Sequence, residues 1–341
     1  MSRIALIIFY AGSLPGYFRY FEDSFARNEN DNVDVYLFND CLSQPDTSGN
    51  LKKIPLTLEQ FNELASQKLG IPINTDWGYK ISEFRPAFGI IFEDYLKDYD
   101  FWGYCDPDII LGKISHFITE EVLANHDVIT ASEKQLVGHF TIFRNSETVK
   151  NLFRQTDDYI KIFTDNAQYY NFDESCRRFY GRPLSFDELR ETSQPASIYD
   201  LVMNLKEKYN LNVYMNPMCR EEPPFNLTYR DGVFFDSITQ KEFLYFHLVK
   251  AKLFYLFHFY MPPMESLPAE FSIVTGGIIP GSSSYSSRLN WSVKRSLFIS
   301  QYFLKKIWSK LKFEPKQPLR GWERRTLNRE NRPEAPFVSP D

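Results

Sequence analysis

The chain has 341 residues, enough to bury a substantial core in one large domain or in one domain with an appendage. Its four cysteines form no C-x-x-C pair, so the sequence indicates neither a zinc ribbon nor a disulfide framework, and a reducing compartment is the simplest interpretation. The net charge is −5, yet residues 288–329 hold twelve lysines and arginines against two glutamates, which suggests an anionic partner for this segment. No apolar run reaches the length of a transmembrane helix. We therefore expect a cytoplasmic protein, soluble or peripherally attached to the inner face of the cell membrane.

The first forty residues predict a strand-helix-strand unit. An apolar run at residues 4–9, a helical repeat at 17–25 and a second apolar run at 33–38 have the pattern of parallel strands joined by a helix. In such a unit the loops that follow both strands lie on one edge of the sheet. This places Tyr10 at the same edge as Asn39 and Asp40.

Further elements follow in chain order. Helical spacing predicts helices at residues 57–69, 81–96 (with a kink at Arg85-Pro86), 114–123, 146–162 and 201–209. Strand patterns occur at residues 99–104, 128–130, 138–145 and 213–215, and an Asp-Gly turn signal predicts a hairpin at 227–235. The strand at 99–104 is expected to deliver the segment after it to the same edge as the first two strands.

That segment contains Asp106 and Asp108, one residue apart, between an aromatic run and an aliphatic run. In an extended segment both carboxylates point to the same side, so they can bind one hard divalent cation such as Mg²⁺ or Mn²⁺, which in turn bridges a diphosphate. The alternative is that Asp-Pro-Asp is only a turn. The position at a strand end, where α/β proteins form ligand sites, favours the metal site.

A second informative stretch is the aromatic strand that ends at His247. The imidazole offers one neutral metal ligand, and Lys250 and Lys252 offer cations for a phosphate. A histidine here is by itself more typical of a core residue with its hydrogen bonds satisfied. Together with the Asp106/Asp108 pair, it is predicted to be a third metal ligand.

These pieces together resemble the GT-A class of glycosyltransferases, which use nucleotide sugars as donors. The motifs are Trp77-Gly78-Tyr79-Lys80, Phe84-Arg85-Pro86 and Phe101-Trp102-Gly103-Tyr104-Cys105-Asp106-x-Asp108, and they resemble uncharacterised bacterial proteins from polysaccharide-biosynthesis loci. The resemblance covers roughly residues 1–260. It implies an α/β fold with a mixed, mainly parallel central sheet flanked by helices, and Mn²⁺ or Mg²⁺ held on the donor diphosphate by Asp106 and Asp108.

The resemblance also implies roles for other residues. The segment from His247 to Lys252 is similar to the His-x-x-Gly-x-x-Lys segment of the retaining galactosyl and glycogenin-like branch, although Lys250 replaces the glycine and Lys252 stands one position early. By position, Phe9, Tyr10, Asn39 and Asp40 are expected to hold the nucleotide, Lys80 and Arg85 the diphosphate, and Gly138 and His139 the sugar. The acidic pair Asp173/Glu174 is expected on the acceptor side.

The expected reaction is transfer of a sugar, most simply from a UDP-sugar, to a glycan or lipid-linked acceptor in surface polysaccharide synthesis such as lipopolysaccharide or capsule. In an inverting enzyme Asp173 or Glu174 would deprotonate the acceptor hydroxyl; the His247 motif favours retention. Two alternatives stay open: a HAD-like phosphohydrolase with Asp106 as nucleophile and Asp108 as general acid, and a non-catalytic scaffold of polysaccharide assembly. No basic aromatic face indicates nucleic-acid binding.

Three parts are expected along the chain. They are a GT-A domain at residues 1–280, a basic amphipathic helical extension at 281–314 and a disordered tail at 315–341. Within residues 291–313 apolar side chains recur at helical spacing beside lysines, the profile of an interfacial membrane helix. The alternative is a helix that packs on the body of the protein with its lysines in water.

Overall fold

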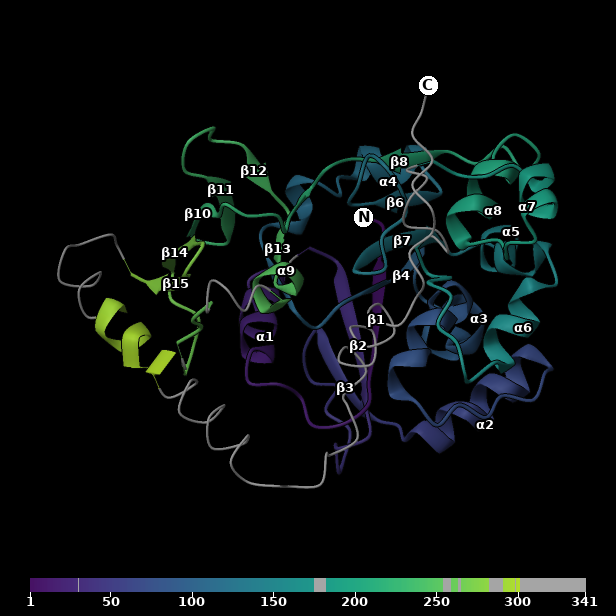
Figure 1. The fold of residues 1–341 in the computed structure, drawn as a ribbon, viewed down its shortest axis with the longest axis horizontal. Coiled ribbons are helices and arrows are strands. Elements are labelled where there is room, and N and C mark those ends of the chain that lie inside the picture. The colour runs from purple at the N-terminus through teal and green to yellow at the C-terminus, as the bar shows by residue number, and fades with distance from the viewer. Residues whose placement is uncertain are drawn as a thin grey trace.

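The centre of the computed structural model is a seven-stranded sheet with the strand order β3-β2-β1-β4-β7-β6-β8 (Figure 1). β2 is parallel to β1 and β3, β1 to β4 and β6 to β8, whereas β7 is antiparallel to β4 and β6. The strands are β1 Ile4–Tyr10, β2 Val33–Asn39, β3 Leu51–Pro55, β4 Phe101–Cys105, β6 Val128–Thr130, β7 Phe140–Arg144 and β8 Val213–Met215. The structure describes residues 1–29, 31–174, 182–253, 259–262, 265–281, 291–297 and 299–300. The predicted mixed, mainly parallel sheet is confirmed.

Helices cover both faces of this sheet (Figure 1). In β1, Ala5 and Ile7 join the core on the side of α2, α3, α6 and α8, while Ile4 and Leu6 join the core on the side of α1 and α4. Burial on both faces is why the strand is a continuous apolar run. The helices are α1 Phe18–Ala26, α2 Leu58–Leu69, α3 Phe88–Ile91, α4 Glu120–Asn125, α5 Glu147–Lys150, α6 Asp158–Thr164, α7 Phe186–Thr192, α8 Ile198–Leu205 and α9 Val249–Leu253.

Some predicted helices are confirmed and others are shorter than expected. Thr57 caps α2 in a capping box with Gln60, and Gly70 ends the helix in the left-handed conformation, as its sequence indicates. The helix predicted at 81–96 is instead a 3-10 helix at Gly78–Ala87, then α3, then a 3-10 turn at Glu93–Tyr95. Pro86 lacks an N–H and interrupts the α-helical hydrogen bonds. The segments predicted at 114–123 and 146–162 are likewise broken into short helices.

Two smaller sheets accompany the central one. A three-stranded sheet has the order β5-β13-β9, with β5 Ile109–Leu111, β9 Cys219–Arg220 and β13 Tyr245–His247. A five-stranded antiparallel sheet has the order β12-β11-β10-β14-β15, with β10 Asn226–Arg230, β11 Val233–Asp236, β12 Glu242–Phe243, β14 Glu270–Val274 and β15 Gly277–Pro280. The predicted hairpin is β10-β11, and both turn residues, Asp231 and Gly232, have positive φ angles.

The C-terminal segment is described only in part. Residues 291–297 and 299–300 are helical, and this helix packs against the turn between β14 and β15. There Trp291 Nε1 donates a hydrogen bond to the Ile278 carbonyl at 2.8 Å, and Arg295 Nε donates to the Gly276 carbonyl at 3.1 Å. The rest of the predicted amphipathic segment and the tail at 315–341 lie outside the described residues, so the three-part division stays a prediction. Among the described residues, no helix is both long and apolar enough to span a bilayer.

Candidate functional site

The predicted Asp-x-Asp segment connects the central sheet to the three-stranded sheet. β4 ends at Cys105, Asp106 and Asp108 follow, and β5 begins at Ile109. Two backbone hydrogen bonds hold the segment in place: Asp106 N–H donates to the His139 carbonyl at 3.2 Å, and Leu248 N–H donates to the Asp108 carbonyl at 2.9 Å. The segment is therefore tied both to the start of β7 and to the end of β13.

The pairing of β13 with β5 brings His247 to these carboxylates. Because His247 lies opposite Ile109 in the antiparallel register, its ring is close to Asp108. His247 Nε2 lies 3.5 Å from Asp108 Oδ1 and 3.7 Å from Asp106 Oδ2. Within the described part of the chain this buried nitrogen has no hydrogen-bond partner. Two carboxylates and an unpartnered imidazole nitrogen facing them are a donor set that fits a divalent cation.

Positive side chains neutralise the buried Asp108 carboxylate. The Lys252 ammonium donates a hydrogen bond to Asp108 Oδ2. It also donates to the Tyr17 hydroxyl at 3.4 Å. Burial favours the neutral acid, but Lys252 and His247 outweigh it and lower the pKa of Asp108. Burial likewise opposes a charge on His247, yet Asp108, Glu221 and Asp106 raise its pKa to about 10. The carboxylate is thus ionised and lies between two cationic groups.

Arg85 connects Asp106 to the predicted acidic pair, Asp173 and Glu174. Its guanidinium donates to the Asp106 carboxylate, to Asp173 Oδ2 at 2.8 Å and to the Gly138 carbonyl at 2.7 Å. Gly138 N–H in turn donates to Glu174 Oε1 at 3.0 Å. Asp173 is almost fully buried, whereas Glu174 is only half-buried. The structure therefore brings Arg85, Gly138 and the acidic pair to the same place as Asp106.

The predicted nucleotide residues lie at the ends of β1 and β2, as expected from the parallel register. Tyr10 is opposite Asn39. Asn39 is buried, and its side-chain amide donates hydrogen bonds to the Tyr10 and Gly12 carbonyls at 2.5 and 2.8 Å. Asp40 accepts a hydrogen bond from Gly12 N–H at 2.6 Å. Phe9 packs on Phe61, with ring centroids 5.1 Å apart. Asn39 thus fixes the loop after β1, and its contact with a nucleotide stays a prediction.

Two of the lysines that we expected to contact phosphate, Lys80 and Lys250, lie away from Asp106 and Asp108. Lys80 is completely buried, where it pairs with Glu83 at 3.3 Å and donates to the Gln168 carbonyl at 2.8 Å. The expectation that Lys80 contacts a diphosphate is therefore wrong, because its ammonium is enclosed in the core. Lys250 is half-exposed and pairs with Glu222 at 3.3 Å. Of the two lysines after His247, it is Lys252 that reaches Asp108.

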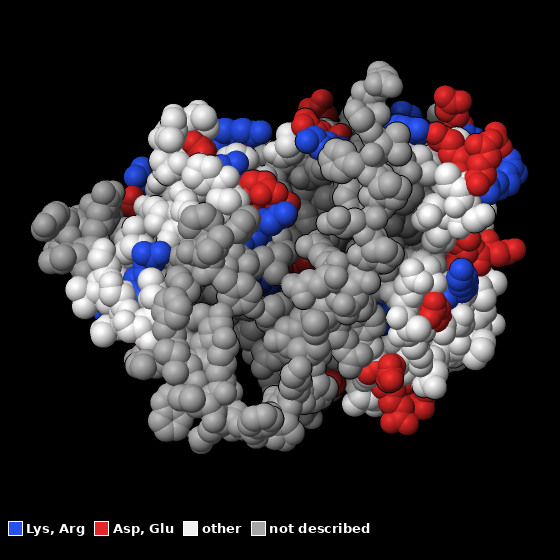
Figure 2. All heavy atoms as spheres, viewed as in Figure 1, with Lys and Arg blue, Asp and Glu red and all other residues white. Residues whose placement is uncertain are grey.

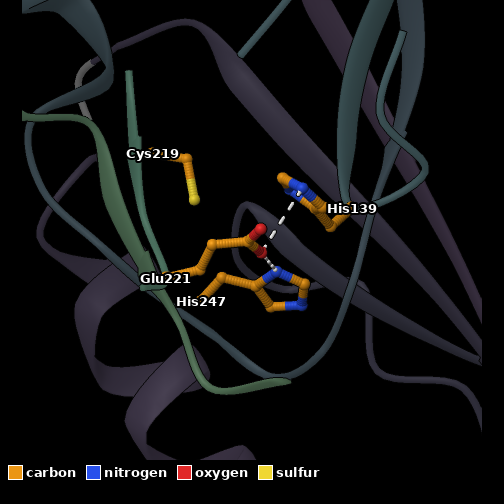
Figure 3. Close-up of side chains that lie close together, drawn as sticks. All are labelled: His139, Cys219, Glu221 and His247. Atoms are coloured by element: carbon orange, nitrogen blue, oxygen red, sulfur yellow. Dashed lines mark hydrogen bonds and ion pairs between the residues drawn. The ribbon is translucent and has the colours of Figure 1, made fainter. Parts of the chain in front are cut away.

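The sequence analysis missed Cys219 and Glu221, which lie beside His139 and His247 (Figure 3), and it also missed Tyr245. Glu221 Oε2 lies 2.9 Å from His247 Nδ1, and the Tyr245 hydroxyl lies 2.6 Å from His139 Nδ1. Burial and the charge on His247 lower the pKa of His139 to about 4, so His139 is neutral at pH 7. The sequence Glu-Glu-Pro-Pro at 221–224 resembles an exposed turn. Only the pairing of β9 with β13 shows that Glu221 points inward.

Charged side chains on the surface do not form a basic face in the part that Figure 2 colours. Lys and Arg are interspersed there with Asp and Glu on the view shown. The described surface on this side therefore offers no stripe of positive charge of the kind that tracks a nucleic-acid backbone.

Comparisons with known proteins give a family but no activity. Residues 6–280 match a family of unknown function, DUF6625. No curated protein matches the chain. Among solved structures, the chain is similar to the galactosyltransferase LgtC in complex with donor and acceptor sugar analogues, at 12% identity and a TM-score of 0.29, over 64% of this chain and 75% of that one. Since the family match covers most of the chain, the protein belongs to the family of unknown function DUF6625.

Proposed function

We propose that this protein is a metal-dependent glycosyltransferase that moves a sugar from a nucleoside diphosphate sugar, with UDP-sugars as the first candidates, to a glycan or lipid-linked acceptor. The observation that carries the proposal is the convergence of Asp106, Asp108 and the unpartnered His247 Nε2, with Lys252 and Arg85 on either side. Oxygen-rich donors with one imidazole suit Mn²⁺ or Mg²⁺. When bound, such an ion would supply a positive charge against which a diphosphate leaving group is stabilised.

The protein's own cations have distinct roles in this proposal. Lys252, together with His247, neutralises Asp108 when no metal is bound, and its flexible ammonium can move to a phosphate oxygen when a donor binds. Arg85 has three fixed partners, Asp106, Asp173 and the Gly138 carbonyl, so it holds the site together. We therefore assign the phosphate contact to Lys252 and a positioning role to Arg85.

The two residues of the acidic pair, Asp173 and Glu174, are also expected to have different roles. Asp173 accepts hydrogen bonds from Arg85 at 2.8 Å and from the Tyr169 hydroxyl at 3.2 Å, and its burial keeps it from solvent. Glu174 accepts a hydrogen bond from Gly138 N–H at 3.0 Å and is only half-buried. In an inverting reaction Glu174 is thus the better base for an acceptor hydroxyl. In a retaining reaction, which the His247 motif favours, its role is to hold the acceptor or donor sugar.

The loops after β1 and β2 are assigned to the nucleotide. Tyr10 and Asp40 lie at this edge of the sheet, and Asp40 is exposed beyond its bond to Gly12. Parallel α/β sheets bind ligands at the carboxyl ends of their strands, which supports this placement. A lipid-linked acceptor would agree with peripheral attachment through the basic C-terminal segment and with a place in lipopolysaccharide or capsule synthesis.

The test is donor turnover. The full-length protein is incubated with a panel of UDP-sugars and GDP-sugars, a mixture of glycan acceptors and Mn²⁺, and the released nucleoside diphosphate is measured. We expect release that disappears with a chelator and with Asp106→Asn/Asp108→Asn. The matched control Asp187→Asn/Glu191→Gln removes two exposed carboxylates of α7 and is expected to retain activity. Release of inorganic phosphate from a simple phosphomonoester would instead support the phosphohydrolase, and no turnover with any donor would support the scaffold.

A further inference from the structure

A second group of metal-type donors faces the other ring nitrogen of His247, because Nδ1 lies beside Glu221 whereas Nε2 faces Asp106 and Asp108. The register of β9 with β13 places Cys219 opposite Tyr245 and Arg220 opposite Phe246, and Glu221 follows directly after β9. Residues two apart on a strand point to the same face. The Glu221 carboxylate accordingly lies between the His247 and His139 imidazoles, with Cys219 beside them (Figure 3).

The four side chains already lie within the reach of one ion. One donor atom from each of His139, Cys219, Glu221 and His247 lies within 4.8 Å of all the others. Glu221 Oε2 is 2.9 Å from His247 Nδ1 and 4.0 Å from His139 Nε2. The two imidazole rings have centroids 4.3 Å apart, and both histidines are buried. Small side-chain movements would bring all four donors to one centre.

The chemistry of this set differs from that of the carboxylate pair. A thiol, two imidazoles and one carboxylate are the donors that Zn²⁺ and similar borderline ions prefer, usually with four tetrahedral ligands. Asp106 and Asp108 instead offer hard oxygen atoms, which suit Mg²⁺ or Mn²⁺. We propose that His139, Cys219, Glu221 and His247 form a second cation site, for a zinc-class ion. This site stands on its own donors and does not depend on the proposed glycosyltransferase activity.

The shared histidine couples the two sites. In the absence of a metal, the cationic His247 carries a proton on Nδ1, toward Glu221, and one on Nε2, toward Asp108. An ion beside Asp108 must displace the Nε2 proton, while Nδ1 keeps its proton. When a zinc-class ion takes Nδ1 instead, the Nδ1 proton is released to solvent and the Nε2 proton stays, so Nε2 faces the Asp108 carboxylate as a donor and does not bind a metal. Binding also releases the Cys219 thiol proton to solvent, because the thiolate is the ligand. Zinc is therefore expected to oppose Mn²⁺ at the Asp106/Asp108 pair.

Cobalt(II) tests the site directly, since a cobalt-thiolate bond gives a charge-transfer absorption that nitrogen and oxygen ligands do not give. The full-length protein, freed of metal with a chelator, is titrated with Co²⁺ and then with Zn²⁺. We expect one thiolate-bound Co²⁺ per chain, displaced by one Zn²⁺. The band is lost in Cys219→Ser and retained in Cys41→Ser, which removes an exposed thiol. It is also retained in Asp106→Asn/Asp108→Asn, which separates this site from the proposed donor site.

A second variant covers the case in which Cys219→Ser does not fold. Glu221→Gln keeps the side-chain shape and a thiol at position 219, and it is expected to weaken Co²⁺ binding about tenfold or more. Absence of a thiolate band in the wild type would overturn the proposal. So would a band that survives Cys219→Ser, or Co²⁺ binding in Glu221→Gln that equals the wild type.

Discussion

His247 Nε2 lies 3.5 Å from Asp108 Oδ1, although these two residues are far apart in the sequence. The contact exists because β13 pairs antiparallel with β5, which directly follows the Asp-x-Asp segment. A buried carboxylate, a buried imidazole and the Lys252 ammonium then share one small space. Such a grouping carries a cost in desolvation, which the binding of the proposed cation and its anionic ligand would offset.

The two lysines after His247 should differ sharply. Lys252 donates to Asp108, while Lys250 pairs with Glu222 at 3.3 Å on a half-exposed side chain. We expect Lys252→Met to weaken Mn²⁺-dependent UDP binding about tenfold, because a charge-assisted contact to phosphate is lost. Lys250→Met is expected to stay within about twofold of the wild type. Isothermal titration calorimetry measures both, and equal losses in the two variants would refute the assignment.

Lys80 should matter for stability and not for the nucleotide. Its ammonium and the Glu83 carboxylate are both completely buried. Lys80→Met leaves the Glu83 charge without its partner, and the expected loss is about 3 kcal/mol in the free energy of unfolding. Urea denaturation measures that loss. UDP affinity of the folded variant at low temperature is expected to equal that of the wild type, and a large loss of affinity would restore Lys80 to the binding site.

Arg85 should couple stability to activity. Its removal in Arg85→Met takes a cation from Asp106 and from the buried Asp173 at once. We expect a loss of about 3 kcal/mol in unfolding free energy, together with loss of donor turnover. Arg85→Lys retains the charge but cannot reproduce the three directed hydrogen bonds, so turnover is expected to fall in this variant too. Full turnover in Arg85→Lys would show that only the charge matters.

A substitution at Gly103 tests the close packing of β4, the strand before Asp106, against β7. A Cβ at this position would lie 2.4 Å from the Thr141 carbonyl oxygen of β7. Gly103→Ala is therefore expected to destabilise the protein by about 1–3 kcal/mol through overpacking. Gly49 has no atom within 4 Å of its Cβ position, so Gly49→Ala is the matched control and should be close to neutral. A thermal unfolding curve for each variant decides, and equal melting temperatures would count against the packing.

Much of this arrangement was predictable because it depends on local patterns. The apolar runs of β1 and β2, the strand before Asp106, the Asp231-Gly232 turn and the capping residue Thr57 are each determined by their own neighbours. The parallel register then follows from the strand-helix-strand order, which is why Tyr10 and Asn39 were expected side by side and are.

What the sequence could not show depends on tertiary contacts. β3 contains Lys52 and Lys53 and is only half-buried at the sheet edge, so it lacks an apolar signal. In the sequence Lys80 resembles an exposed phosphate ligand, because nothing there shows that it is buried as an ion pair with Glu83, three residues later. Glu221 looks like a loop residue because its partner, His247, comes from another strand. A charged side chain reveals its role only when its partner is known.

The most direct test of the account is calorimetric titration of UDP into the full-length protein, with and without Mn²⁺, on the wild type and on Asp106→Asn/Asp108→Asn. We predict binding by the wild type that requires Mn²⁺ and is lost in the double variant. The Asp187→Asn/Glu191→Gln control should bind as the wild type does. Binding that is independent of the metal, or that survives loss of both carboxylates, would contradict the proposed site, as would failure to bind UDP, GDP or any other nucleoside diphosphate.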